Sequence, residues 1–439
     1  MKIFLGISSF QILAMFRRGL FYSYLTIYLR HFLGLSVTTT TLFATFPMIV
    51  NVLSQRYLWG VLSDKYQKRR SLIVWGEILA GLGTIFLWYC HRIPAGKTEA
   101  GWVVILGLSI IEIFWSMSNI GWSALISDIY AKGNRSSVMG KLESLGGVGR
   151  VMGVLAGGLL YDRMGTAFAG WGFYNGILFW ISGIIMFMSI FPMFLVPEGG
   201  IDKTPKKNTP KKDQIQGQIQ GQIQGQIQGQ IQGQIQDQDN FVPPVFFVFI
   251  AAMTLIHFGR NSVAVTMPQY LSLPTGLNLS AITLSHVVNI RSLGIIITGL
   301  FVGILCKKFG ERHLLALSSF AAALSLFILG ISTSLYWVCL SSFIMGFSDV
   351  IIIAASYELA AAYIPAQKRG KLFAIFNATF FLSWGIAGTL IAGPITDGLI
   401  RLGKLETYAY MASFNASALI TLSGVVVLFA LFHIEKKPR

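Results

Sequence analysis

The sequence predicts an all-α integral membrane protein with twelve transmembrane helices in two pseudo-symmetric six-helix bundles. Three observations predict this fold class. Of 439 residues, 54% are apolar and only 12% are charged, which leaves too little polar surface for a soluble protein of this size. Apolar segments of about 20 residues, the length that crosses a hydrocarbon core, recur from end to end. Finally, the second half of the chain repeats features of the first.

The twelve predicted helices follow one another with mostly short loops between them. The first begins like a signal peptide, but it has no small-x-small cleavage site and continues unbroken, so we expect it to be retained. The helices are predicted near residues 5–30, 39–62, 70–91, 102–127, 138–161, 172–196, 244–271, 281–305, 313–331, 335–361, 371–396 and 408–433.

The formal charge of +16 is distributed unevenly between the two sides of the membrane. Of the 34 Lys and Arg residues, six lie within predicted helices and six in loops on one side, which leaves 22 on the side of both termini. The positive-inside rule makes that side cytoplasmic. We therefore predict a multi-pass protein of the cell membrane with both termini in the cytoplasm, and no nucleic-acid partner.

A change in composition divides the chain into three parts. Residues 1–196 and 244–439 each contain six predicted helices. Residues 197–243 contain a Lys-rich stretch and five consecutive QIQG tetrapeptides from Gln214 to Gly233. Such copying without a core-forming partner favours a disordered cytoplasmic tether between two bundles.

The two bundles have matching residues at nearly constant shifts along the chain. A shift of 242 places Arg18 on Arg260, a shift of 243 places 60–70 on 303–313, and shifts of 234 to 235 place Arg135 on Arg369 and Asp162 on Asp397. The longer loop after the third helix accounts for the smaller shift. This duplication predicts two copies of one six-helix unit.

The stretch "GVLSDKYQKRR" (60–70) carries a family resemblance. It is similar to the signature loop between helices 2 and 3 of the major facilitator superfamily, and the six-plus-six arrangement resembles that family along the whole chain outside the tether. An acid at the end of a helix needs a cation or another helix N-terminus nearby. We therefore expect a gating contact of Asp64 with Arg69 or Arg70, with Gly60 beginning the motif; the resemblance implies the start of the eleventh helix as a further partner. Gln67 replaces the usual glycine, which predicts a less tight turn.

Six arginines fall within predicted helices, where charges normally face the bundle interior or an aqueous cavity. They are Arg17, Arg18, Arg56, Arg150, Arg260 and Arg291. Five acids can pair with them: Glu77, Glu112, Glu143, Asp349 and Glu358. Ion pairs and an anionic ligand are therefore both open explanations.

The symmetry of Arg18 and Arg260 favours a ligand, because equivalent positions on helices 1 and 7 face each other in transporters built from repeats. Two facing guanidinium groups can bind one phosphate or dicarboxylate through paired hydrogen bonds. The segment "HFGRNSVAVTMPQYL" (257–271) also resembles the organophosphate:phosphate antiporters, which implies phosphate binding at these two arginines. Those antiporters use a histidine on helix 5, where this chain has Arg150.

We therefore predict a secondary transporter that moves a small organic or phosphorylated anion by alternating access between Arg18 and Arg260. Further candidate binding residues are Arg150, Arg291, Tyr22 and His257. Anion binding would draw helices 1 and 7 together, so exchange of one anion for another follows. We expect a monomer in the bilayer, with neither cofactor nor metal.

Two alternatives remain open. The glycine-rich "GRVMGVLAGG" (149–158) resembles the helix-5 motif of proton-coupled drug antiporters, although small residues at this spacing also serve helix packing. In that case Glu112, Asp349 or Glu358 would take up the coupling proton after burial. The third reading is a membrane receptor that does not transport. An enzyme is not expected, since no nucleophile or phosphate-loop motif is present.

Overall fold

The computed structural model describes residues 2–130, 132–200, 244–364 and 369–436, and all regular structure in these residues is helical. The first half contains α1 (Lys2–Ile27), α2 (Val37–Ser54), α3 (Gly60–Tyr66), α4 (Arg69–His91), α5 (Lys97–Ile129), α6 (Lys132–Tyr161), α7 (Trp171–Tyr174) and α8 (Ile177–Met193). The second contains α10 (Pro244–Ser262), α11 (Thr266–Leu271), α12 (Ala281–Phe309), α13 (Glu311–Ile331), α14 (Leu335–Tyr363), α15 (Arg369–Ala387), α16 (Gly393–Arg401) and α17 (Glu406–Lys436).

Three π-helical turns join pieces of long helices. Tyr28–Phe32 extends α1, Gln55–Trp59 joins α2 to α3, and Gly388–Ala392 joins α15 to α16. Wider turns of this kind bend a helix without breaking its hydrogen bonding. In the described part of the chain, eleven helical segments are long and apolar enough to cross a membrane.

The sixth predicted span is shorter than expected. The sequence predicts a helix over 172–196, but α8 has 17 residues and follows the single turn of α7. The break falls at Gly176, whose backbone is left-handed with φ 91° and lies against the indole of Trp88. Its apolar character still makes α8 the sixth span of the first half. The predicted fold class is therefore confirmed.

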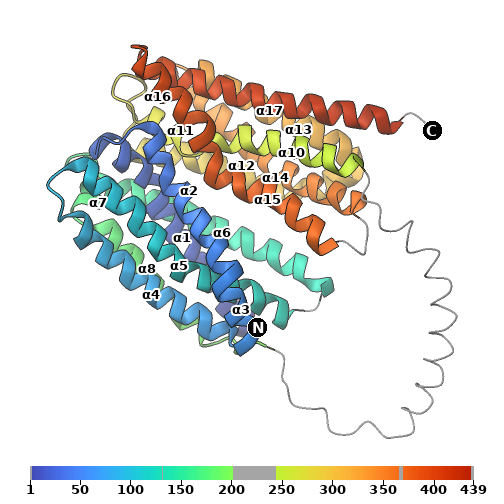
Figure 1. The fold of residues 1–439 in the computed structure, drawn as a ribbon, viewed down its shortest axis with the longest axis horizontal. Coiled ribbons are helices and arrows are strands. Elements are labelled where there is room, and N and C mark those ends of the chain that lie inside the picture. The colour runs from blue at the N-terminus through green and yellow to red at the C-terminus, as the bar shows by residue number, and fades with distance from the viewer. Residues whose placement is uncertain (1, 131, 201–243, 365–368, 437–439) are drawn as a thin grey trace, which may run out of the picture.

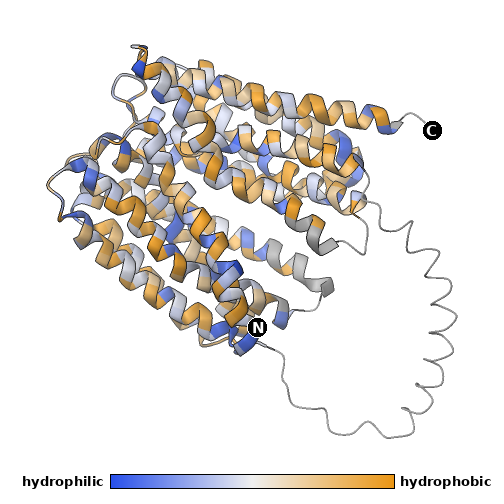
Figure 2. Cartoon of the chain, viewed as in Figure 1, coloured by the Kyte–Doolittle hydropathy of each residue, from blue (hydrophilic) through white to orange (hydrophobic). Residues whose placement is uncertain are grey.

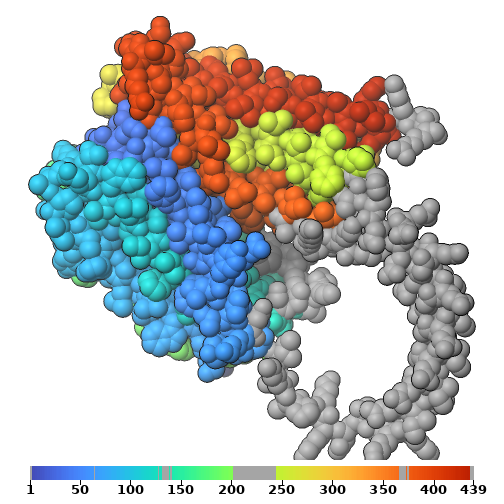
Figure 3. Space-filling model, in the orientation of Figure 1, coloured from blue at the N-terminus to red at the C-terminus, as the bar shows by residue number. Residues whose placement is uncertain are grey.

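The helices form two bundles that lie side by side, with α1–α8 in one and α10–α17 in the other (Figure 1). In the first bundle α1 packs against α6 and α8, and in the second α10 packs against α15 and α17. The bundles meet along α6 with α12, and along α2 with α15 and α16; the second contact is visible in Figure 3. The predicted tether, apart from residues 197–200, lies outside the described residues.

The outer faces of the bundles are apolar. Large exposed side chains such as Phe86, Leu300 and Phe429 are 56 to 69% exposed, and apolar residues cover α4 and α17 in Figure 2. Monomeric soluble proteins rarely expose large contiguous apolar surfaces of this kind. These faces are the ones that contact lipid.

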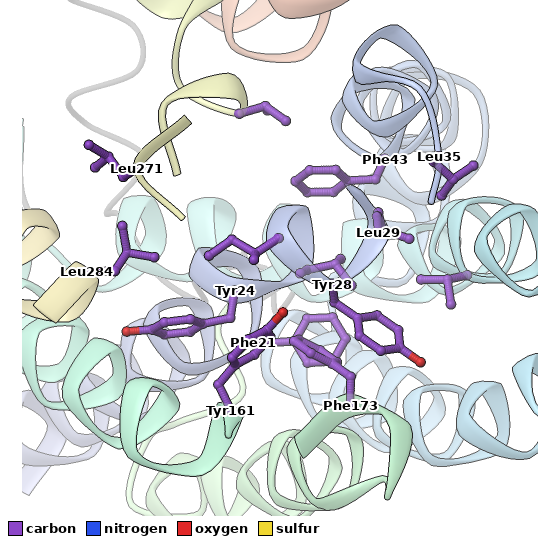
Figure 4. Packing of buried hydrophobic residues seen from close by; sticks show 14 of the residues in the cluster. Phe21, Tyr24, Tyr28, Leu29, Leu35, Phe43, Tyr161, Phe173, Leu271 and Leu284 are labelled. Carbon is purple, nitrogen blue, oxygen red and sulfur yellow. The ribbon is translucent and has the colours of Figure 1, made fainter. Parts of the chain in front are cut away.

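One apolar cluster, shown in Figure 4, contains residues of both bundles. It includes the end of α1 (Ile27) and the beginning of α17 (Tyr410), the helix ends away from the chain termini. Tyr24 and Tyr28 of the first half belong to the same buried cluster as Leu271 and Leu284 of the second. Tyr24 also donates to the carbonyls of Val154 and, at 3.4 Å, Ala281. This packing closes the space between the bundles at that end.

Candidate functional site

In the second half, one carboxylate holds two arginines from different helices. Arg260 of α10 donates through Nη1 to Asp349 Oδ1 of α14 at 2.7 Å. Arg291 of α12 donates through Nε and Nη2 to Asp349 Oδ2 at 3.0 and 2.7 Å. A single negative charge therefore serves two positive charges, and Arg260 Nε is buried without a described hydrogen-bond partner.

His257 lies one turn before Arg260 and contacts it. Arg260 Nη2 is 3.3 Å from His257 Nδ1, and because a guanidinium can only donate, Nδ1 must be the acceptor. The ring also packs edge-on against Phe380 at 5.4 Å. His257 therefore contacts Arg260 and Phe380 and accepts a hydrogen bond from the guanidinium.

In the first half, an aromatic ring replaces the carboxylate. The guanidinium carbons of Arg17 and Arg18 lie 4.2 and 4.7 Å from the ring centroid of Trp115 on α5, within the range of cation–π attraction. Tyr22 stacks against Trp115 at 6.1 Å and against Phe43 at 6.4 Å. Among the described contacts, no salt bridge joins Arg18 to an acid.

Arg17 and Arg18 have different surroundings although they are neighbours in sequence. Arg17 is 4% exposed and lines a cavity of about 10 Å³ inside the first bundle, beside Tyr22, Thr84 and Ser182. Glu77, which accepts from Ser118 at 2.7 Å, is within electrostatic range of it. Arg17 therefore serves the interior of its own bundle.

Arg150 connects the two groups of arginines. It lies on α6 within electrostatic range of Arg18 of its own half and of Arg291 and Asp349 of the other. The halves touch at this level, where Asn289 Nδ2 donates to the carbonyl of Val151 at 3.3 Å. We call Arg18, Arg150, Arg260, Arg291 and Asp349 the central arginine cluster.

The other candidate acids, Glu112, Glu143 and Glu358, have no described salt bridge with an arginine. Glu112 is 7% exposed and accepts a hydrogen bond from Asn51 Nδ2, within electrostatic range of Arg18. Glu143 on α6 is exposed and also within range of Arg18. Glu358 is exposed near the end of α14. Only Asp349 enters the cluster.

The signature loop is tied to its own bundle. Arg69 contacts Asp128 of α5 at 3.2 Å and the carbonyl of Ser63, while Arg70 pairs with Glu198 at 3.2 Å. The side chain of Asp64 lies outside the described residues, so its expected contact is a prediction still. Gly60 begins α3, where a Cβ would meet the carbonyl of Gln55 at 2.6 Å.

The expectation of a looser turn at Gln67 is wrong. Gln67 has φ 56°, in the left-handed region, and Gly310 at the equivalent place in the second half has φ 77°. The arginine side chain next to it explains how a non-glycine residue is held there, because Arg69 Nη2 donates to Gln67 Oε1 at 3.0 Å. Gln67 therefore adopts the left-handed backbone that glycine favours, although its ψ of 20° differs from the 144° of Gly310.

The glycine stripe of α6 packs against α1. A Cβ at Gly149, Gly153 or Gly157 would lie 2.3, 1.9 or 2.7 Å from the carbonyl oxygens of Ile12, Phe16 and Leu20. Such close backbone contact is what small residues permit between membrane helices. Helix packing explains the stripe without a role in proton coupling.

Sequence reasoning missed Trp115 altogether. Nothing in its local sequence marks a tryptophan in an apolar helix as a partner of arginines. The duplication does offer a signal, since Trp115 and Asp349 are 234 residues apart, the same shift that places Arg135 on Arg369.

Two bundles with apolar outer faces and a buried basic cluster define an integral membrane protein. The family model described as Major Facilitator Superfamily matches residues 7–273 and 248–439. The chain therefore belongs to the major facilitator superfamily and is a multi-pass membrane transporter.

Solved structures agree with this fold. The nucleoside transporter NupG has a TM-score of 0.68 at 14% identity, with all of both chains covered. A bacterial homologue of the human lysosomal transporter Spinster, inward-facing and occupied, has a TM-score of 0.66 at 13% identity over 98% of this chain and 96% of that one. A variant of the peptide transporter POT in complex with sulfate also scores 0.66, at 15% identity over 98% and 94% of the two chains.

One curated relative is similar in sequence over a shorter stretch. The probable galactarate/D-glucarate transporter GarP of Escherichia coli K12 is 28% identical over 121 residues. The aligned stretch spans 26% of this chain and 27% of GarP, about a quarter of each.

Proposed function

We propose that this protein is a secondary transporter that moves a small organic anion by alternating access and binds it at the central arginine cluster. The observation that carries the proposal is the excess of positive charge there. Arg260 and Arg291 of the second half share one carboxylate, Asp349. Arg150 of the first half lies within electrostatic range of Asp349, Arg291 and Arg18. Guanidinium groups bind carboxylates and phosphates through paired hydrogen bonds, so an anion is the natural ligand.

The location of the cluster suits a transported ligand. Arg18 and Arg150 belong to the first half, and Arg260 and Arg291 to the second. An anion bound by both halves favours the arrangement in which they are closest, and a ligand shifts a conformational equilibrium only through such differential contacts. Exchange of one anion for another follows, because the empty carrier lacks this stabilisation.

The sequence relative supports a carboxylate as the charged group. GarP is described as a probable transporter of galactarate and D-glucarate, which are sugar acids with a carboxylate at each end. A molecule of this class offers one carboxylate to each half of the cluster. Phosphorylated compounds meet the same chemistry, so we place them second.

We further propose that the protein is a monomer in the cell membrane with its termini in the cytoplasm, as the distribution of Lys and Arg predicts. Every described hydrogen bond between the halves lies at the level of Asn289 and Val151 or farther from the termini. The cytoplasmic side would then be the open one. Asp64, Gly60, Arg69 and Arg70 are proposed to control closure of that side.

Transport in liposomes tests the proposal. Purified protein is reconstituted with D-glucarate, glycerol 3-phosphate or phosphate inside, and uptake of the same labelled compounds and of a lipophilic cation is measured with and without a pH gradient. We expect counterflow of at least one anion, lost in Arg18→Gln. Movement of the cation alone contradicts the proposal, and silence with every compound would favour a receptor.

A coupling proton is a second element of the proposal, and Glu112 is its candidate carrier. Glu112 is buried but accepts a hydrogen bond from a neutral amide and has no described salt bridge, whereas Asp349 is fixed between two arginines. In a Glu112→Gln variant we expect anion exchange to persist while acceleration by a proton gradient is lost. Acceleration equal to that of the unmodified protein would exclude Glu112.

A further inference from the structure

The two halves surround equivalent arginines with different chemistry. Arg18 and Arg260 are equivalent by the repeat, and so are Trp115 and Asp349, which are 234 residues apart on α5 and α14. In each half the residue from this helix contacts the arginine from the first helix of that half. Each half thus has a contact between these two positions, but the partner of the arginine is a neutral aromatic ring in one half and a carboxylate in the other.

In the second half the pair is a salt bridge. Arg260 and Asp349 are 2% and 10% exposed at their side chains and 2.7 Å apart. Asp349 also binds Arg291 through its other oxygen. Both carboxylate oxygens are in use, so Arg260 and Arg291 already share an ionic hydrogen-bond partner before any ligand arrives.

In the first half the pair is a cation–π contact. Trp115 orders the guanidinium of Arg18 at 4.7 Å but brings no negative charge. Arg18 Nε is buried without a described hydrogen-bond partner. Glu112 and Glu143 lie within electrostatic range of Arg18, but no described salt bridge joins either acid to it.

We propose that Trp115 is a positioning residue that keeps Arg18 ordered without giving it a direct ionic partner, so that the anion binds first at Arg18, while Asp349 occupies Arg260 and Arg291 until a second anionic group of the substrate takes its place. This inference rests on the proposed transport of anions. It adds an order of binding and a substrate class, a molecule with two separated anionic groups. The second anionic group of the substrate must compete with Asp349 for Arg260 and Arg291. This group, and not the one bound by Arg18, therefore sets specificity.

The first test places a carboxylate beside Arg18. Binding of labelled D-glucarate and of labelled glycerol 3-phosphate is measured on the purified full-length protein. Trp115→Asp gives the first half the chemistry of the second, and we expect it to weaken binding about tenfold or more, since a desolvated ionic partner of Arg18 would have to be displaced. Trp115→Phe retains an aromatic face and is expected to bind within about threefold of the unmodified protein.

Two controls separate positioning from folding. Trp102→Phe changes a tryptophan of the same helix that is 36% exposed, and it should leave affinity unchanged. Each variant is compared by size-exclusion profile and thermal unfolding, because a purely structural effect of Trp115 would lower stability in Trp115→Phe as well as in Trp115→Asp.

A double variant tests the exchange of roles directly. In Trp115→Asp with Asp349→Asn, Arg18 gains a carboxylate partner and Arg260 loses its own. We expect affinity to recover to within about fivefold of the unmodified protein. A double variant that binds no better than Trp115→Asp alone overturns the inference.

The outcomes distinguish the inference from the proposed function. If neither probe binds the unmodified protein, the proposed function fails and the inference fails with it. If a probe binds, depends on Arg18, and binds Trp115→Asp with undiminished affinity, only the inference is overturned.

Discussion

At the scale of single residues, Arg17 and Arg18 of α1 are neighbours in sequence but have different surroundings. Arg17 lines a small cavity of its own bundle and has the larger electrostatic effect on Glu77, whereas Arg18 is within electrostatic range of Arg150. Successive residues on a helix point about 100° apart, so two adjacent charges can serve different spaces. Trp115 contacts both.

This division predicts different defects for the two arginines. Arg17→Gln should lower the free energy of unfolding by roughly 1–3 kcal/mol, because buried Glu77 loses a favourable positive charge within electrostatic range. Arg18→Lys should unfold normally but raise the KM for anion exchange about tenfold, since an ammonium group cannot reproduce paired hydrogen bonds. Thermal unfolding and uptake kinetics measure the two effects. Equal loss of stability in both variants would contradict the division.

At the scale of secondary-structure elements, the closed end is held by a carboxylate at a helix start. Asp397 of α16 accepts from the backbone N–H groups of Val37 and Thr38 at 2.9 and 2.8 Å, so the second half supplies a cap for α2 of the first. An acid at a helix N-terminus is favourable in both hydrogen bonding and dipole interaction. A second link is the salt bridge of Arg30 with Glu406 at 2.9 Å.

The equivalent residue in the first half does not act in this way. Asp162 accepts from Gly165 N at 3.1 Å within its own loop, and α12 is capped instead by Ser280, which accepts from Thr283 N at 3.2 Å. The cap supplied by Asp397 is therefore specific to the α2 contact.

Asp397→Asn is predicted to weaken the closed end by about 1 kcal/mol, the usual worth of such a cap. Ala392 is fully buried there. In a variant whose native cysteines are replaced by serine, we expect Ala392→Cys to react with a membrane-impermeant maleimide about fivefold faster after Asp397→Asn. Unchanged reactivity would show that the apolar cluster alone closes this end.

Much of the element level could be predicted from the sequence. Apolar length alone predicts α13 over 313–331 and α14 over 335–361, and the structure has Glu311–Ile331 and Leu335–Tyr363. The break before α8 was missed, because it depends on how Gly176 packs against Trp88. Hydropathy carries no information about such a contact.

The site was less accessible to prediction than the fold. The repeat predicts Arg18 and Arg260 as equivalent positions, but whether a buried arginine meets an acid depends on the rotation of each helix in the bundle. Asp349 was expected only as one of several acids, and its two arginine contacts became visible in three dimensions. The partnership of Trp115 with Arg18 required the structure.

At the scale of the whole molecule, the two bundles are joined at one end. The central arginine cluster lies near the middle of their interface. The described cross-links, such as Thr26 with Val265 at 2.8 Å and Thr41 with Thr389 at 2.8 Å, lie on the side away from the termini. Closure of the opposite side therefore needs a new source of attraction. An anion that bridges arginines of both halves supplies it.

The most direct measurement of this account is the distance between the bundles at the terminal end with and without the anion. Spin labels at Tyr66 and Phe309, which are 59% and 52% exposed, report that end after the native cysteines are replaced. The added anion is the one with the strongest counterflow in liposomes. We predict that it shifts the distance distribution to shorter values and that Arg18→Gln abolishes the shift. A distribution that the anion leaves unchanged, or a shift that persists without Arg18, would contradict the account.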